Sequence, residues 1–314
     1  MQAYRKEELI EALIRVRPYV HHTPVLTSTL LNRLSGAEVF FKCENFQRMG
    51  AFKMRGAVNA ILQLPENVRK SGVVTHSSGN FAQALSLAAR SLGISAYIVM
   101  PENAPEAKKA AVADYGGTII LCPPTLQDRE QTAKRIVDNK NATFIHPSND
   151  RNVILGQSTA AQELLEEYPD LEYIITPVGG GGLLAGTALA THFFGNGCGT
   201  IAGEPLEADD AYRSLKSGKI ESNTTVNTIA DGLKTELGDQ NFPVIQKYVE
   251  QIIRVNEPEI KNAMKLIYER MKIVVEPSSA VAFAALLQKS YDFKNRRVGI
   301  ILSGGNVDLS NLPF

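Results

Sequence analysis

Apolar residues along this chain fall into two kinds of segment, short continuous runs and longer stretches with helical spacing. Between the runs, residues 80–92 and 105–115 have the spacing of amphipathic helices. Because strands that alternate with helices are typical of parallel sheets with crossover helices, the pattern predicts an α/β fold. The runs that predict strands are residues 39–41, 73–75, 97–100, 118–121, 143–145, 173–176, 200–203 and 298–302.

Length and pattern together predict two lobes. The chain has 314 residues, more than one domain usually contains, and its 44% hydrophobic content is enough for a substantial core. The strands between residues 72 and 145 form a self-contained β-α-β-α-β series, which predicts a smaller lobe. Since no repeat or Pro/Ser-rich linker separates the parts, we expect closely packed lobes and a chain that passes between them more than once.

Charge and cysteine content exclude several classes of partner. The 33 basic and 33 acidic residues cancel, so the chain offers no electrostatic basis for binding nucleic acid or an anionic membrane surface. Cys43, Cys122 and Cys198 are widely spaced, which argues against both a disulfide framework and a zinc ribbon. With no apolar signal at the N-terminus and no run long enough to span a bilayer, we expect a cytoplasmic protein.

Candidate chemistry lies where predicted strands lead into helices, because ligands of open parallel sheets bind beyond the carboxyl ends of the strands. The first such junction is His76-Ser77-Ser78-Gly79-Asn80, whose backbone N–H groups at a helix start can bind a carboxylate. Ser and Asn are also preferred N-cap residues, so by itself this junction is better read as an ordinary cap. The last strand leads into Ser303-Gly304-Gly305-Asn306, where a hydroxyl could contact a flat ring, although a plain glycine turn fits as well.

Four consecutive glycines, Gly179, Gly180, Gly181 and Gly182, form the strongest of the junctions. Glycines weaken a fold, so their use before a helix indicates that a phosphate group approaches bare backbone amides. A flexible turn is the simpler alternative. Gly180-x-Gly182-x-x-Ala185 also satisfies the dinucleotide fingerprint, with Glu204 at about 20 residues' distance, so a nicotinamide-dependent dehydrogenase is a second functional reading.

Lys53 is the candidate reactive amine. It stands at the predicted start of a helix that continues through residues 54–62, and the helix dipole there lowers the pKa of an amine. Lysines with a depressed pKa form Schiff bases, although most lysines are solvated surface charges. The dehydrogenase reading assigns no role to this residue.

Four segments together resemble the fold-type II pyridoxal-phosphate family of serine racemases and serine/threonine dehydratases. The order and spacing match across nearly the whole chain; the segments are residues 50–57, 76–80, 179–182 and 303–306. The resemblance implies parallel-rich twisted sheets flanked by helices, in a large cofactor-binding domain of residues 1–71 and 149–314 and a small substrate-gating domain of residues 72–148. It also implies a cofactor between the lobes and a homodimer.

The resemblance assigns a role to each matching position. Lys53 would hold pyridoxal 5'-phosphate as a Schiff base and act as the base on one face of the cofactor, beside Phe52. Asn80 would bind the ring hydroxyl, the glycines 179–182 the phosphate, and Ser303 the pyridine nitrogen. Backbone amides of Ser77, Ser78, Gly79 and Asn80 would bind the carboxylate of a small amino-acid substrate, with Ser78 on the face opposite Lys53.

These roles predict β-elimination, with racemisation as the runner-up. A neutral serine at the ring nitrogen favours loss of a β-hydroxyl after Cα deprotonation, which converts a hydroxy amino acid to a 2-oxo acid and ammonia. Ser78 could exchange a proton on the far face, as a serine racemase requires, and threo-3-hydroxyaspartate is a further candidate substrate. A catalytically silent amino-acid sensor on the same fold is the alternative without chemistry.

A second site is implied by the same resemblance. In the run 204–210, the carboxylates of Glu204 and Asp210 and the carbonyl of Ala208 correspond to a divalent-cation site. Oxygen ligands suit magnesium, manganese or calcium, whereas a solvated acidic loop is the simpler alternative.

The chain also departs from the family pattern. Phe81 replaces the histidine that usually follows the asparagine, and residues 146–150 differ from the usual sequence near the cofactor, which affects substrate choice. The nucleotide site of racemases matches only in part, so regulation by ATP is not expected.

Overall fold

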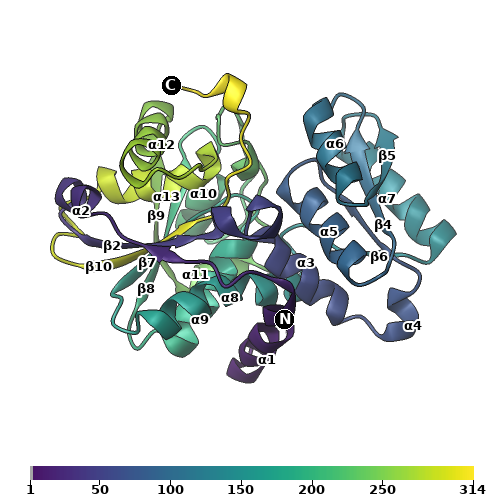
Figure 1. The fold of residues 1–314 in the computed structure, drawn as a ribbon, viewed down its shortest axis with the longest axis horizontal. Helices are drawn as coiled ribbons and strands as arrows, with labels where there is room; N and C mark the ends of the chain where they lie inside the picture. The colour runs from purple at the N-terminus through teal and green to yellow at the C-terminus, as the bar shows by residue number, and fades with distance from the viewer. Residues whose placement is uncertain (1–2) are drawn as a thin grey trace.

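Two sheets lie side by side in the computed structural model, which describes residues 3–314 (Figure 1). The larger sheet has six strands in the order β1-β2-β10-β7-β8-β9, and the smaller has four in the order β5-β4-β3-β6. All pairs are parallel except β1 with β2. The strands are β1 Val25–Leu26, β2 Glu38–Cys43, β3 Val73–His76, β4 Ala96–Pro101, β5 Thr118–Cys122, β6 Thr143–Phe144, β7 Tyr173–Pro177, β8 Gly199–Pro205, β9 Val249–Val255 and β10 Arg297–Leu302. The expected parallel α/β architecture is confirmed.

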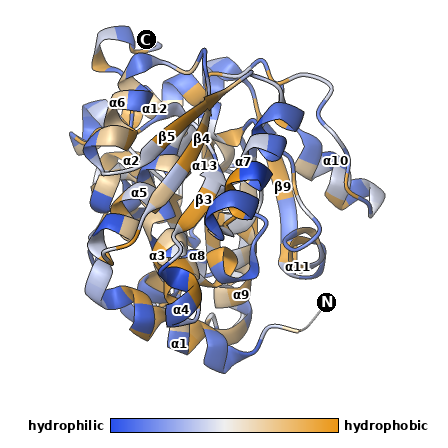
Figure 2. Cartoon of the chain, turned by 90° about the vertical axis from the view of Figure 1, so that its right-hand side faces the viewer, coloured by the Kyte–Doolittle hydropathy of each residue, from blue (hydrophilic) through white to orange (hydrophobic). Residues whose placement is uncertain are grey.

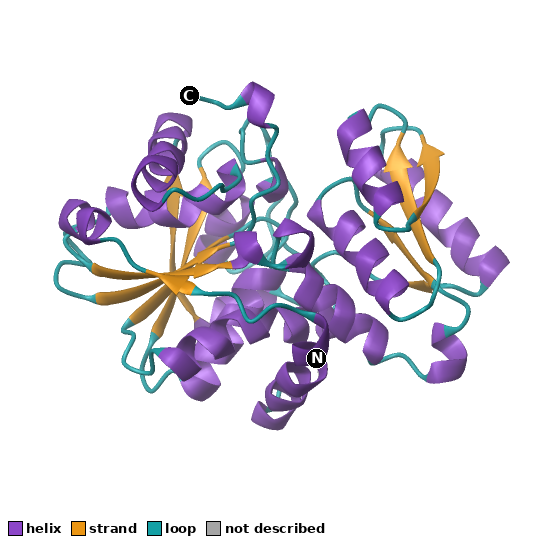
Figure 3. Ribbon diagram, in the orientation of Figure 1, coloured by secondary structure: helices purple, strands orange, loops and turns teal. Residues whose placement is uncertain are grey.

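Helices cover both sheets, as the colouring by secondary structure in Figure 3 shows. The α-helices are α1 Lys6–Val16, α2 Thr29–Ser35, α3 Lys53–Leu62, α4 Glu66–Arg69, α5 Asn80–Ser91, α6 Glu106–Asp114, α7 Leu126–Lys140, α8 Arg151–Glu167, α9 Gly182–Phe194, α10 Asp210–Ser217, α11 Phe242–Tyr248, α12 Glu257–Met271 and α13 Pro277–Gln288. Short 3-10 turns are η1 Arg17–Tyr19, η2 Glu44–Phe46, η3 Arg48–Gly50, η4 Asp231–Leu233 and η5 Leu309–Asn311.

The larger sheet is buried on both faces. Ile174 of β7 belongs to a cluster with Leu183 of α9, whereas its neighbour Ile175 belongs to a cluster with Val281 of α13. Successive side chains of a strand point to opposite faces, so a strand between two helical layers must be apolar at every position. This explains why the strands appear in the sequence as continuous apolar runs.

The smaller sheet is built in the same way. Val73 of β3 lies in a cluster with Leu85 of α5, and Val74 lies in a different cluster with Ala133 of α7. Figure 2 shows these apolar strands between the two helices. The cluster on the α5 side also contains Val58 of α3, so this helix joins the core of the smaller sheet to the rest of the molecule.

The structure adds two strands to the expected set. β1 has only two residues, too few for a pattern. In β9, Glu250 and Gln251 are both exposed, and the register with β8 shifts beside Thr200 and Ile201. A bulge at a sheet edge breaks the alternation of buried and exposed positions, which hides the strand from a periodicity argument. The helix expected over 105–115 begins at Glu106, with Pro105 as its N-cap.

Among residues 3–314, no helix is both long enough and apolar enough to cross a membrane.

Candidate active site

Lys53 begins α3, where the predicted helix start is confirmed. The preceding turn lies against the end of β10, since the N–H of Phe52 donates to the Ser303 carbonyl at 3.0 Å and Ala51 forms a bridge with Gly304. The structure therefore brings together two predicted site residues, Lys53 and Ser303, from opposite ends of the chain. Ser303 is only 3% exposed.

The Lys53 amine points toward the small-sheet part of the chain. Its Nζ donates to the Pro147 carbonyl at 2.8 Å and lies 5.1 Å from the ring centre of Phe52 and 5.8 Å from that of Phe81. Loss of water around this half-buried amine lowers its pKa to about 8, an effect that the nearby carboxylate of Glu276 opposes. The expected direction is confirmed, but burial is the main cause. At neutral pH a useful fraction of the amine is unprotonated, as nucleophilic attack requires.

The glycine run lies at the N-terminus of α9, as expected for an anion site. Gly181 is the N-cap, with φ +78°, a left-handed conformation that favours glycine. Each glycine also lies against other parts of the protein. A Cβ on Gly179 would lie 2.6 Å from the Leu233 Cα, and one on Gly182 would lie 2.8 Å from the Ser148 carbonyl oxygen. Packing alone therefore excludes side chains here, and the backbone N–H groups at the start of α9 are of the kind that bind an anion.

Two residues that the sequence reasoning missed form the walls of this cradle. Asn241, which is fully buried, donates to the Gly180 carbonyl at 2.8 Å and accepts from the Gly238 N–H at 3.1 Å. The Ser148 hydroxyl would lie 2.4 Å from a Cβ on Gly180, so it faces the glycine run. Ser148 lies in the segment 146–150 that the resemblance places near the cofactor, and this was the signal that could have found it.

The junction 77–80 starts α5 directly, with Asn80 as its first residue. The Asn80 amide donates to both Glu276 carboxylate oxygens, at 3.0 and 3.1 Å, and its oxygen accepts from Asn306 at 2.9 Å. Asn80 is therefore held by Glu276 and Asn306, which belong to the part of the chain around the six-stranded sheet. Ser77 and Ser78 are half-buried, and no hydrogen bond within residues 3–314 links Ser78 to Lys53.

Glu276 is a further residue that the sequence reasoning missed. It is 4% exposed and is the N-cap of α13, and its backbone N–H donates to the Gly304 carbonyl at 3.0 Å. Burial raises the pKa of this carboxyl to about 7, while the Asn80 amide opposes the rise. A lone glutamate before a proline carries no signal of this role in the sequence.

His146 faces the same space from the segment after β6. Its Nδ1 accepts N–H bonds from Ser148 at 3.2 Å and Asn149 at 2.8 Å. Burial, His76 and the Lys53 ammonium lower its pKa to about 4, so the imidazole is neutral at physiological pH. Residues 146–149 thus form a polar but uncharged side of the site.

The predicted cation ligands lie elsewhere, at the end of β8. Both Glu204 and Asp210 are fully buried, so they do not form a solvated loop. The Glu204 oxygens accept N–H bonds from Ala211 and Tyr212 at 2.8 Å each, and Asp210 accepts from the Leu237 N–H at 2.9 Å. Ala208 is also buried.

Burial raises the proton affinity of both carboxylates, and the negative charge of Asp210 adds to the effect on Glu204. Burial and Asp210 raise the pKa of Glu204 well above its ordinary value, and burial raises the pKa of Asp210 to about 6. Within the described part of the chain, no three or more His, Cys, Asp or Glu side chains gather to hold a metal ion. A cation here would use only two carboxylates, a carbonyl and water.

The chain is similar to known proteins over nearly its whole length. A family model described as "Pyridoxal-phosphate dependent enzyme" matches residues 16–304. The chain is 49% identical over 310 residues to serine racemase of Dictyostelium discoideum, covering 98% of this chain and 96% of that protein. It is 46% identical over 308 residues to beta-hydroxyaspartate dehydratase of Paracoccus denitrificans, covering 98% of each. The solved structure of a threonine deaminase from Solanum lycopersicum has a TM-score of 0.90 at 31% identity, covering 98% of this chain and 92% of that one.

Proposed function

Since the chain belongs to the pyridoxal-phosphate-dependent enzyme family, we propose that it is a serine/threonine-type dehydratase that converts a β-hydroxy amino acid to a 2-oxo acid and ammonia. The family membership favours the phosphate reading of the glycine run over the dinucleotide reading. The observation that carries the proposal is the half-buried Lys53 amine, with a pKa of about 8, in a turn that is hydrogen-bonded to Ser303.

The residues present fit the cofactor. Lys53 would bind it covalently, Gly179 to Gly182 would hold its phosphate at the α9 N-terminus, and Ser303 would contact its ring nitrogen. Phe52 would flank the ring, and Asn80 would bind its hydroxyl. When bound, pyridoxal phosphate supplies an electron-accepting ring that stabilises negative charge at the substrate Cα.

The protein's own residues carry the proton transfers. The N–H groups of Ser78, Gly79 and Asn80 at the start of α5 would bind the substrate carboxylate. The expected contribution of the Ser77 N–H does not fit the structure, because that group donates to the Val99 carbonyl at 3.2 Å. Lys53 Nζ, set free when the substrate amine takes its place, would remove the Cα proton. The resulting Lys53 ammonium could then give a proton to the β-hydroxyl as the C–O bond breaks, so that the hydroxyl leaves as water. The resulting enamine is hydrolysed to the 2-oxo acid and ammonia.

Racemisation is the second candidate, and Ser78 supports it. A hydroxyl on the face opposite Lys53 could return a proton there, and relatives of this chain are named serine racemase. Another relative is named for dehydration of beta-hydroxyaspartate, which supports 3-hydroxyaspartate as an alternative substrate.

A test of the cofactor and its attachment comes first. The purified protein, loaded with pyridoxal phosphate, is expected to show a visible absorbance band that borohydride abolishes, leaving a reduced adduct that mass spectrometry maps to Lys53. Lys53→Ala should lose the band and the adduct. An adduct on another lysine would contradict the assignment.

The reaction is tested by incubating the enzyme separately with L-serine, D-serine, L-threonine and threo-3-hydroxyaspartate. Keto acid and the chirality of remaining substrate are measured together. We expect keto acid to dominate over racemised substrate, and Ser78→Ala to lower racemisation more than elimination. Dominant racemisation would overturn the primary assignment, and bound cofactor without turnover would indicate a sensor.

We also propose that Glu204, Asp210 and the Ala208 carbonyl hold a divalent cation. The support is the pair of buried carboxylates whose repulsion a cation would relieve. The alternative is that Glu204 only caps α10, whose first N–H groups it accepts. Magnesium, manganese or calcium, added separately to the metal-stripped protein, should raise its Tm, and Asp210→Asn should abolish the rise. An unchanged Tm in the wild type would favour the cap.

We propose a small substrate-gating domain of residues 72–148 around the four-stranded sheet and a large domain formed by the rest of the chain. We propose a homodimer, which sedimentation equilibrium would test. A cytoplasmic location fits the three buried free thiols, which a reducing compartment preserves.

A further inference from the structure

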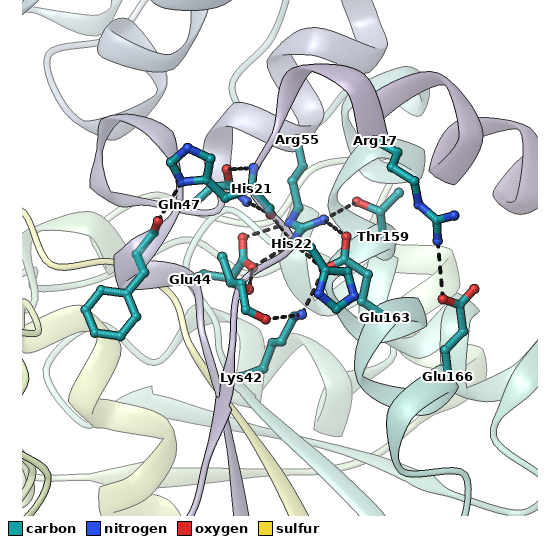
Figure 4. Close-up of polar contacts among 12 residues, drawn as sticks. Arg17, His21, His22, Lys42, Glu44, Gln47, Arg55, Thr159, Glu163 and Glu166 are labelled. Atoms are coloured by element: carbon teal, nitrogen blue, oxygen red, sulfur yellow. Dashed lines mark hydrogen bonds and ion pairs between the residues drawn. The ribbon is translucent and has the colours of Figure 1, made fainter.

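Directly behind the Lys53 turn lies a buried cluster of charged side chains that the proposed reaction does not use. Its members are Lys42 of β2, Glu44 of η2, Arg55 of α3 and Glu163 of α8 (Figure 4). None of the four side chains is more than 2% exposed. When all are ionised the two cations and two anions cancel. Charges buried this deeply persist only where each is paired and hydrogen-bonded.

Arg55 is the centre of this cluster, and all five of its N–H donors have acceptors. Nε and Nη2 donate to the two Glu44 oxygens at 2.8 Å each, while Nη1 and Nη2 donate to the two Glu163 oxygens at 2.8 Å each. The remaining N–H of Nη1 reaches the Thr159 hydroxyl at 3.2 Å. A planar fork that binds two carboxylates at once fixes both the direction and the distance of each partner.

The other members fix the partners in turn. Lys42 Nζ donates to Glu163 and to the Thr23 carbonyl at 2.8 Å each, and the Thr23 hydroxyl donates to Glu44 at 2.6 Å. Glu163 keeps its charge, since Arg55 and Lys42 hold the pKa of its carboxyl below the ordinary value although burial acts against this. The cluster thus joins β2 and the turn after it to α3 and α8 without leaving an uncompensated charge.

These elements are the ones that place the reactive residues. Arg55 is two residues after Lys53 on α3. Glu44 directly follows Cys43, which is opposite Leu302 in the β2–β10 register, and Ser303 comes next. Through Glu44 the cluster therefore connects the start of α3 to the strand ends that hold Ser303.

A close helix crossing also brings α3 against α8, the helix that carries Glu163. At its crossing with α8, a Cβ on Gly156 would lie 2.5 Å from the Arg55 carbonyl oxygen, so the two backbones approach closely beside the cluster. Close contact resists separation of the helices, but it does not fix the position of α3 along its own axis. A directional ion pair between Arg55 and Glu163 fixes that position.

We propose that Arg55, held by Glu44 and Glu163, is a positioning residue that sets where the Lys53 amine lies relative to Ser303 and the glycine cradle. This inference rests on the proposed role of Lys53. If the cluster were only structural, its loss would lower stability and leave the chemistry of the folded protein unchanged. A positioning role predicts losses in attachment of the cofactor and in kcat that stability does not explain.

The test compares Arg55→Lys with Glu163→Gln and with a control, Met264→Ala. Lysine keeps the charge but cannot bind two carboxylates bidentately. Glutamine is nearly isosteric with glutamate and keeps an oxygen for Arg55, so it serves if Arg55→Lys does not fold. Met264 is fully buried on α12, in a cluster without any α3 residue, so its truncation destabilises the protein away from Lys53.

For each protein we would measure Tm, the Kd of pyridoxal phosphate for the apoprotein, the fraction reduced onto Lys53 by borohydride, and kcat and KM. We expect Arg55→Lys to raise the cofactor Kd and lower kcat by about tenfold or more, with KM within about threefold, because small misplacements of a reacting group are costly. Glu163→Gln should show a smaller loss in the same direction. Met264→Ala should lower Tm and keep kcat and Kd within about twofold.

The inference is overturned if Arg55→Lys and Glu163→Gln fold and match the wild type in cofactor Kd and kcat. It is also overturned if Met264→Ala, with the same Tm as these variants, shows the same decrease in kcat as they do. If only Glu163→Gln folds and its cofactor Kd is unchanged, the inference also fails. If the wild type forms no borohydride adduct at Lys53, both the proposed function and this inference are overturned. If the wild type does form the adduct, the results for the variants test the role of Arg55 separately from the proposed function.

Discussion

At the scale of single residues, the environment of Lys53 decides its chemistry. The amine lies near two aromatic rings, Phe52 from its own turn and Phe81 from the first turn of α5. A cation near aromatic faces gains some attraction, but exclusion of water dominates and lowers the pKa of the amine to about 8. Phe81 is one of the positions at which the sequence was expected to depart from the family pattern.

Phe81→His should therefore change the reactivity of Lys53. A polar ring admits water, so we expect the pKa of Lys53 to rise by roughly half a pH unit or more toward its ordinary value of 10.5. The measurement is the pH dependence of the rate at which pyridoxal phosphate attaches to Lys53 in the apoprotein. Phe81→Leu is the matched control, because it keeps the site apolar. A histidine variant with the wild-type profile would show that Phe81 does not control the amine.

Glu276 predicts a specific pH dependence of stability in the apoprotein. Its pKa rises from 4.5 to about 7 on folding, so the folded state binds the extra proton between these values. The stability that this group contributes is fully present below its unfolded pKa and is lost as the pH rises through about 7.

Glu276→Gln removes this titration. The variant should match the wild type at about pH 4 and exceed its free energy of unfolding by up to about 3 kcal/mol at about pH 8. Urea unfolding at several pH values measures the difference. If the free energies of unfolding of the variant and the wild type differed by the same amount at every pH, the Glu276 carboxyl would have its ordinary pKa in the folded protein.

At the scale of elements, the crossing of α3 and α8 depends on glycine in both helices. A Cβ on Gly156 would lie 2.5 Å from the Arg55 carbonyl oxygen and 2.6 Å from the Gly56 Cα. These are backbone atoms, which cannot move as a flexible side chain can. Larger residues would force the helices apart and strain the turn that contains Lys53.

We expect Gly156→Ala to lower the free energy of unfolding by about 1–3 kcal/mol, although alanine favours helices. Urea unfolding followed by circular dichroism would measure the loss. Gly79→Ala is the control, since no atom lies within 4 Å of a Cβ added there; it should change stability by at most about 0.5 kcal/mol. A neutral Gly156→Ala would show that the helices separate easily.

At the scale of the whole molecule, the small sheet shares a hydrophobic core with α3 and α8, two helices that lie outside residues 72–148. The cluster that contains Val73 and Ile98 of the small sheet also contains Met54 and Ile61 of α3 and Val153 of α8. Further links are polar, such as the ion pair between Lys108 of α6 and Asp231 at 2.6 Å. Because that pair is partly exposed, it adds little to stability, and the shared core provides most of the coupling.

This shared core predicts coupled unfolding of the two parts. Amide hydrogen exchange should give β4 and β7 opening free energies within about 1 kcal/mol of each other. Ile98→Ala should lower both values together by about 2–5 kcal/mol. If β4 opened at a clearly lower free energy than β7, the small sheet would unfold as an independent unit.

The sequence by itself determined the α/β class, most strands, and the residues whose chemistry is unusual for their position. Strands buried on both faces appear as continuous apolar runs, and the four glycines and Lys53 stand at predicted helix starts. These are local properties, since periodicity and helix-terminus chemistry depend on neighbours in the chain.

Only the tertiary structure decided which distant residues meet. Glu276 and Asn241 carry no local pattern, yet one holds Asn80 and the other supports the glycine cradle. The cluster around Arg55 draws its members from separate parts of the chain, and a buried charge is recognisable only once its partners surround it. The pKa of Lys53 likewise follows mainly from water exclusion by segments far apart in the chain, which no local pattern encodes.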